Sequence, residues 1–158
     1  MNYLIDIQNA TDVPLPLNEQ ELSDLAILAL RDNIDKAELT IRLVNQDEMI
    51  HLNNSYRQLN KTTNVLAFPA MIPEAVELEY PLLGDVIICP EVLAHESEAL
   101  KKGLKEHWSL IVIHGVLHLL GYDHIKDDDA VKMQAVEIKL LNELGFSNPY
   151  EIEESNFE

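Results

Sequence analysis

The amino-acid sequence predicts an α+β domain, in which a small mixed β-sheet packs against about five helices. Three observations favour this class. Segments with the apolar/polar alternation of half-buried strands are interspersed with segments that carry helix start signals. The chain has 158 residues, of which 47% are apolar, which suits one domain with a sizeable core. Residues 105–120 are largely apolar and predict a central buried helix.

Local patterns place each element in order. Residues 2–9 and 38–44 alternate as strands with one buried face do. Asn18 with Glu21 forms a capping-box pattern, which predicts a helix through about residue 32. The remaining expected elements are a helix from Asn45 to about Arg57, a strand over 64–68 stopped by Pro69, a loop to Pro81, a strand over 85–89, a helix opened by Pro90, the helix from about Lys105 to Leu120, and a last helix from Asp127 or Asp128 to near Gly145.

The chain is expected to form one domain over residues 1–150, followed by an acidic tail without fixed structure over 151–158. Its single cysteine, Cys89, rules out an internal disulfide and fits a reducing compartment. The N-terminus lacks the basic and apolar regions of a signal peptide, and no apolar stretch is long enough to span a bilayer. We therefore expect a cytoplasmic protein without a membrane partner.

The most informative motif runs from His114 to His124 with the spacing H-x-x-x-H-x-x-G-x-x-H. On a helix, His114 and His118 lie one turn apart and share a face. Gly121 can end that helix in a left-handed conformation, after which the chain reverses and can bring His124 to the same point. Three imidazoles with a free fourth position are the arrangement of a catalytic zinc site. Because imidazole ligands favour zinc over magnesium, we expect one Zn²⁺ per chain, with nickel and copper as alternatives.

The same spacing occurs in metzincin proteases, with one difference. Those enzymes carry a glutamate general base directly after the first histidine, where this chain has Gly115. The ligand pattern is kept and the protease base is missing, which favours hydrolysis of a substrate other than a peptide. A metalloprotease-like peptide hydrolase remains an alternative at this point.

Three further residues are candidates for a site around the metal. The Arg57 guanidinium can grip two oxygens of a phosphate, or it can form a surface salt bridge at the end of its helix. Asp85 either belongs to a turn or places a carboxylate near the metal ligands. Asp123 either accepts a hydrogen bond from a ligand imidazole or shapes the turn before His124.

The negative net charge of the chain limits which macromolecules it is expected to bind. With 28 acidic and 11 basic residues the formal net charge is −17, whereas phosphate backbones bind basic surfaces. Broad nucleic-acid affinity is therefore disfavoured, and no DNA partner is expected. A small basic groove, or docking to a basic protein, remains compatible with this charge.

Four motifs stand in the order of one known family: Tyr56-Arg57, Thr63-Asn64-Val65-Leu66-Ala67-Phe68-Pro69, Leu83-Gly84-Asp85-Val86-Ile87, and the segment from His114 to His124. Over about residues 1–150 the chain resembles the YbeY family of bacterial endoribonucleases, the ribosomal RNA maturation factors. It departs from the commonest family pattern at Asn64, where aspartate is usual, and at Ala67, where serine is usual.

The resemblance implies a zinc-dependent, single-strand-specific endoribonuclease that acts in 16S rRNA 3′-end maturation and ribosome quality control. The implied partners are single-stranded ribosomal RNA, the small ribosomal subunit and its proteins. It also implies that His114, His118 and His124 are metal ligands and that Arg57 is the functional arginine. The nucleophile, an activated water or the RNA 2′-hydroxyl, stays open. A second alternative is a non-catalytic ribosome assembly factor with a structural zinc.

Overall fold

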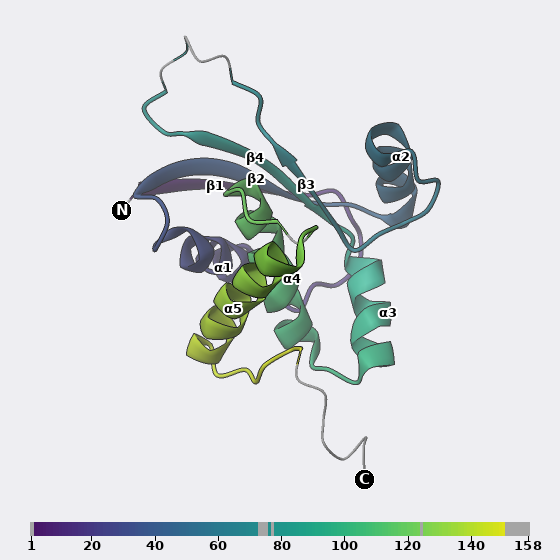
Figure 1. Ribbon diagram of the computed structural model, residues 1–158. Helices are drawn as coiled ribbons and strands as arrows, with labels where there is room; N and C mark the ends of the chain where they lie inside the picture. Colours follow the sequence, from purple (N-terminus) through teal and green to yellow (C-terminus); the bar gives the residue numbers. More distant parts are fainter. Residues whose placement is uncertain (1, 73–75, 77, 124, 151–158) are drawn as a thin grey trace.

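The computed structural model describes residues 2–72, 76, 78–123 and 125–150. In this part of the chain there are four strands and five helices (Figure 1). Their order is β1 (Asn2–Asn9), α1 (Glu19–Leu30), β2 (Lys36–Leu43), α2 (Gln46–Arg57), β3 (Val65–Pro69), β4 (Leu82–Ile88), α3 (Pro90–Leu100), α4 (Leu104–Leu119) and α5 (Asp127–Glu143). The predicted α+β class is confirmed, and the first two histidines of the motif lie on α4.

The strands form one mixed sheet in the order β1-β2-β4-β3. β1 pairs in parallel with β2 and β2 in parallel with β4, while β3 pairs antiparallel with β4. Parallel neighbours need a crossover connection, and α1 supplies it between β1 and β2. The alternation predicted for β2 is present, since Ala37, Leu39, Ile41 and Leu43 are all fully buried on one face. That face forms one side of the main core.

Helix α4 is the centre of the helical layer. In Figure 1 it lies between α1, α5 and α3, below the sheet as drawn, while α2 stands apart at the end of the sheet away from the N-terminus. Eleven of the sixteen residues of α4 are buried, among them Trp108, Ile113 and Leu117. Full burial of each large apolar side chain contributes about 1.5–3 kcal/mol. The predicted central buried helix is confirmed, and its packing holds the histidine backbone in place.

Gly115 allows α4 to approach the sheet closely. A Cβ atom at this position would lie 2.6 Å from Val86 Cγ1 and 3.4 Å from Val65 Cγ2. Since carbon atoms pack at about 3.5–4.0 Å, a side chain here would push α4 away from β3 and β4. A glutamate in this position, the base of the metzincins, would be directed into the sheet. Packing in this fold thus requires glycine at position 115, where the proteases carry their base.

A smaller apolar cluster lies on the other face of the sheet, beneath α2. It contains Val44, Met49, Leu66, Ile87 and Cys89, with partly buried side chains such as Phe68 packed against it. Burial raises the pKa of the Cys89 thiol, which is therefore protonated at neutral pH. This cluster packs α2 against β3 and β4, and so fixes the position of the C-terminal end of α2.

The structure differs from the sequence-based expectation at β4 and at Pro69. β4 begins at Leu82 rather than at residue 85, because the pairing with β2 shifts register by one residue and β4 contains a bulge. Gly84 has φ +136°, and a Cβ atom there would lie 2.1 Å from the carbonyl oxygen of Phe68, so only glycine fits. Pro69 is the last residue of β3 rather than a stop before it. It is tolerated because β3 is an edge strand.

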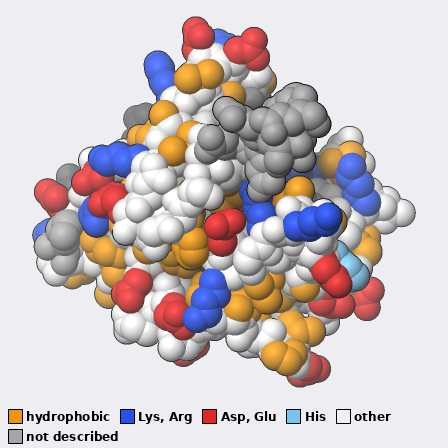
Figure 2. All heavy atoms as spheres, turned by 90° about the horizontal axis from the view of Figure 1, so that it is seen from below, with side chains coloured by type: hydrophobic (Ala, Val, Ile, Leu, Met, Phe, Trp, Pro, Cys, Tyr) orange, Lys and Arg blue, Asp and Glu red, His pale blue; other side chains and the backbone are white. Residues whose placement is uncertain are grey.

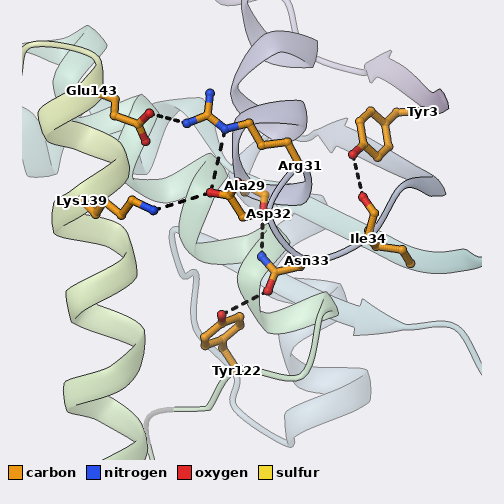
Figure 3. A network of polar contacts seen from close by, with 9 residues as sticks. All are labelled: Tyr3, Ala29, Arg31, Asp32, Asn33, Ile34, Tyr122, Lys139 and Glu143. Atoms are coloured by element: carbon orange, nitrogen blue, oxygen red, sulfur yellow. Dashed lines mark hydrogen bonds and ion pairs between the residues drawn. The ribbon is translucent and has the colours of Figure 1, made fainter. Parts of the chain in front are cut away.

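Polar contacts tie the C-terminal end of α1 to two distant segments (Figure 3). Arg31 and Glu143 form an ion pair between the end of α1 and α5. The Tyr122 hydroxyl donates to Asn33 Oδ1 at 3.2 Å, and the Asn33 amide donates to the Ala29 carbonyl at 3.1 Å. The segment that follows α4 is thereby attached to α1.

The predicted capping box at the start of α1 is present, with reciprocal bonds between Asn18 and Glu21. No helix among the described residues is long and apolar enough to cross a membrane. The predicted tail, 151–158, lies outside the described residues.

Candidate active site

The first two histidines of the motif converge on one point. His114 and His118 lie one turn apart on α4, and their Nε2 atoms are 3.1 Å apart, with the ring planes at 80°. Both side chains are half-buried at the edge of the core. Two nitrogens that bind one zinc at about 2.0–2.1 Å in tetrahedral geometry lie about 3.3 Å apart, so this pair is close to the spacing that the metal needs.

The turn after α4 has the predicted form. Gly121 has φ +102°, and the Tyr122 N–H bonds to the Leu117 carbonyl, which closes a Schellman motif. Asp123 Oδ1 accepts a hydrogen bond from the Ile125 N–H at 3.0 Å, so this side chain does shape the turn. The predicted third ligand, His124, lies outside the described residues. Within residues 2–72, 76, 78–123 and 125–150 there is no cluster of three or more potential metal ligands.

The chemistry of the His114 ring fits a metal ligand. Its Nδ1 lies 2.6 Å from Glu137 Oε2, so this nitrogen carries the proton and donates to the carboxylate. The other nitrogen, Nε2, is then the acceptor and faces His118. A ligand imidazole in proteins commonly donates its second N–H to a carboxylate in this way. The donor set that the structure shows therefore suits zinc, with His124 as the remaining predicted ligand.

Glu137 is the site residue that sequence reasoning missed. It lies on α5, is fully buried, and also accepts a 2.6 Å hydrogen bond from the Tyr150 hydroxyl. A signal was present in the sequence, because Met133, Glu137, Leu140 and Leu141 form one helical face on which glutamate is the single charged residue. A buried carboxylate on an apolar face needs a partner, and that partner is a metal-ligand candidate 23 residues earlier in the chain.

A cavity of about 580 Å³ opens beside the histidine pair. Its walls come from the end of α2, from β3 with the residues before it, and from α4. The residues that line it are Tyr56, Arg57, Thr63, Asn64, Val65, Leu66, Ala67, Phe68, Pro69, His114, Gly115 and His118. Three of the four motifs singled out in the sequence thus meet in one place, although up to 62 positions separate them.

Arg57 stands at the edge of this cavity as the last residue of α2. The next residue, Gln58, is left-handed with φ +58°, and Asn53 holds the following loop through a 2.8 Å bond from its amide to the Lys61 carbonyl. Arg57 is exposed, and the described part of the chain shows no ion pair for it. The salt bridge considered as an alternative is therefore not formed there, and the guanidinium is available to an anion in the cavity.

Asn64, one of the two departures from the common family pattern, has a specific partner. Its amide donates to both carboxylate oxygens of Glu96, at 3.2 and 3.3 Å, and Glu96 also lies 2.9 Å from His107 Nε2. An aspartate at position 64 would face the Glu96 carboxylate, and two like charges repel. The amide thus fits the neighbouring glutamate of this chain and holds the cavity wall to α3.

Asp85 is not placed with the histidine pair. Its neighbour Val86 points to Gly115 on α4, and successive side chains of a strand point to opposite faces. The Asp85 side chain is therefore exposed on the far face of the sheet, beside Phe68 of β3. The structure corrects the interpretation that this carboxylate supports the metal ligands, as well as the alternative that it belongs to a turn.

Comparisons of the sequence and of the fold with known proteins point to one family. A family model described as "Endoribonuclease YbeY" matches residues 6–145. The chain is 63% identical to an endoribonuclease YbeY of Legionella pneumophila (strain Paris) over the full length of both proteins. It is 47% identical to one from Psychromonas ingrahamii, over 95% of this chain and 97% of the relative. A Thermotoga maritima protein solved in solution is similar in fold, with a TM-score of 0.63 and 25% identity over 94% of this chain and 100% of that protein.

Proposed function

The chain belongs to the YbeY endoribonuclease family, and from this premise we propose that it is a zinc-dependent enzyme that cuts single-stranded RNA. The observation that supports the proposal best is that Arg57 and the convergent nitrogens of His114 and His118 line the same cavity. The zinc would be held by these two histidines and His124, one ion per chain. When bound, it would supply Lewis-acid polarisation of a phosphoryl oxygen.

Arg57 would supply a second positive charge, in addition to the zinc, for phosphodiester cleavage. Negative charge develops on the phosphate oxygens as the bond breaks, and a guanidinium can bind two of them at once. Because Arg57 comes from α2 and the histidines from α4, a phosphate in the cavity is held between two elements. The attacking oxygen, from water or from the RNA 2′-hydroxyl, is not assigned to a residue of this chain.

The cavity also offers a surface for an unpaired base. Tyr56 is 67% exposed, and its ring lies against Phe68 with centroids 4.7 Å apart. Aromatic rings beside a charged groove are the usual platform on which proteins stack the bases of single strands. A base in a duplex is already stacked and paired, so this platform favours single-stranded substrates.

The acidic surface is compatible with this assignment if RNA contacts are local. On the face shown in Figure 2, acidic and basic side chains are scattered among apolar ones and do not form a continuous basic surface. RNA affinity then depends on the cavity and on few phosphates. The remaining acidic surface serves solubility or docking to basic proteins.

The biological role that we propose is 3′-end maturation of 16S rRNA and ribosome quality control in the cytoplasm. The partners are single-stranded ribosomal RNA and the small ribosomal subunit with its proteins. Residues 1–150 would form the catalytic domain, and the acidic segment 151–158 a tail.

The assay that tests this function measures metal content and RNA cleavage together. We expect about one zinc per chain, cleavage of single-stranded RNA that stops on chelation and returns with zinc, and little cleavage of duplex RNA. Binding should weaken only gently with salt, with a slope of about two to three phosphate contacts. Casein and peptides are the control substrates. Cleavage of peptides in place of RNA would favour the protease alternative, and stoichiometric zinc without any cleavage would favour the assembly factor.

The stacking platform makes a separate prediction for Tyr56. Tyr56→Ala should raise KM for single-stranded RNA, with little change in kcat, because base stacking on an aromatic ring contributes about 1–3 kcal/mol. Tyr56→Phe keeps the ring and should behave as the wild type. With an oligonucleotide that lacks the base next to the cleaved bond, the difference between wild type and Tyr56→Ala should disappear. Equal KM values for both proteins on intact RNA would exclude the platform.

A further inference from the structure

We propose that Glu137 and Tyr150 act as positioning residues, which through a chain of hydrogen bonds fix the imidazole of His114 for metal binding. This inference rests on the proposed zinc site. Neither residue belongs to the histidine motif: Glu137 lies on α5, and Tyr150 follows that helix near the end of the described chain. The C-terminal segment would thus be part of the support of the metal site.

The contact between Glu137 and His114 determines which ring nitrogen is available. Glu137 Oε2 accepts the Nδ1–H of His114 at 2.6 Å, a short, charge-assisted distance. Without this acceptor the neutral ring can carry its proton on either nitrogen, and one of the two tautomers has a protonated Nε2 that cannot bind a metal. The carboxylate therefore selects the tautomer and also limits rotation of the ring.

Glu137 is itself held by a second contact. Its other oxygen, Oε1, accepts the Tyr150 hydroxyl at 2.6 Å, so each carboxylate oxygen has one partner. The Glu137 side chain is only 1% exposed. Leaving a buried carboxylate oxygen without a partner is costly, so the tyrosine helps to hold the carboxylate in place beside His114. Burial, the hydrogen bond and the Glu137 charge all raise the pKa of Tyr150, which therefore remains a hydrogen-bond donor at neutral pH.

The segment that carries Tyr150 is attached to the domain at several points. The Phe146 side chain packs against the main core, and the Phe146 N–H bonds to the Leu141 carbonyl at 2.9 Å. Lys102 Nζ donates to the Pro149 carbonyl at 2.9 Å, and the Tyr150 N–H donates to Asn148 Oδ1 at 2.8 Å. These contacts place the hydroxyl of a partly exposed residue over a buried carboxylate on α5.

The test uses Glu137→Gln and Tyr150→Phe, with Tyr3→Phe as a matched control. Tyr3, on β1, also donates one 2.6 Å hydrogen bond, to the carbonyl of Ile34 in the segment that follows α1. We expect the zinc dissociation constant, from chelator competition, to rise about 10- to 100-fold in Glu137→Gln. It should rise by a smaller factor in Tyr150→Phe and stay unchanged in Tyr3→Phe. A wild-type dissociation constant in Glu137→Gln would overturn the proposal, and so would equal values in Tyr150→Phe and Tyr3→Phe.

A second measurement works on metal-free protein and is independent of the proposed function. Nitrogen NMR of the histidine rings should show His114 protonated at Nδ1 in the wild type and in Tyr3→Phe. In Glu137→Gln the signal should move toward a mixture of both tautomers. If the wild type binds no zinc and cuts no RNA, the proposed function fails, while this spectrum still decides whether Glu137 orients His114. An unchanged tautomer in Glu137→Gln would exclude that orientation.

Discussion

His114→Ala and His118→Ala should each abolish stoichiometric zinc and reduce RNA cleavage by about 10²- to 10³-fold or more. The two Nε2 atoms lie 3.1 Å apart and face each other, so removing either ring leaves only one of these two nitrogens to bind zinc. The measurements are metal analysis after gel filtration and the cleavage rate of a single-stranded substrate. His118→Ala is expected to keep the fold, because its ring lies at the edge of the core, whereas His114→Ala also removes a partner of the buried Glu137 carboxylate and is expected to lower thermal stability.

His51→Ala is the matched control for the histidine variants. His51 lies on α2 and is exposed, so its loss should change neither zinc content nor cleavage. Far-UV circular dichroism of all three variants separates loss of metal from loss of structure. Full zinc content in both His114→Ala and His118→Ala would contradict the proposed metal site.

Arg57→Glu should lose RNA cleavage by about 10²- to 10³-fold while the protein stays folded and keeps its zinc. The exposed guanidinium at the end of α2 would be replaced by a charge that repels the phosphate in the cavity. Arg57→Lys keeps the charge but loses the two-oxygen grip, so a clear but smaller loss is expected. The readouts are kcat and KM on single-stranded RNA, together with zinc content and thermal stability.

Lys36→Glu makes the same change in net charge at the start of β2, where the side chain is exposed and does not line the cavity. This control should cut RNA almost as the wild type does, since exposed charges more than about 10 Å apart are largely screened. Wild-type cleavage by Arg57→Glu would remove Arg57 from the site. An equal loss in both variants would show that net charge, and not the guanidinium, is responsible.

Much of this protein follows from short-range sequence patterns. The Asn18 capping box, the alternation of β2 and the apolar length of α4 each depend on neighbours within a few positions, and each was predicted correctly. The one-turn spacing of His114 and His118 and the left-handed Gly121 are of the same kind, because helix geometry alone decides them. The family also follows from the order of its motifs.

Other features depend on contacts between distant segments, and only the tertiary structure decided them. The bulge at Gly84 arises from the register between β2 and β4, and the strand begins three residues earlier than the predicted start at residue 85. Asp85 faces away from the histidines because the alternation in β4 is fixed by the contact of Val86 with α4. Glu137 and Tyr150 join His114 through packing of α5 and the C-terminal segment. A sequence pattern records which residues are neighbours along one element, while the partner of a buried polar group is chosen by how the elements pack.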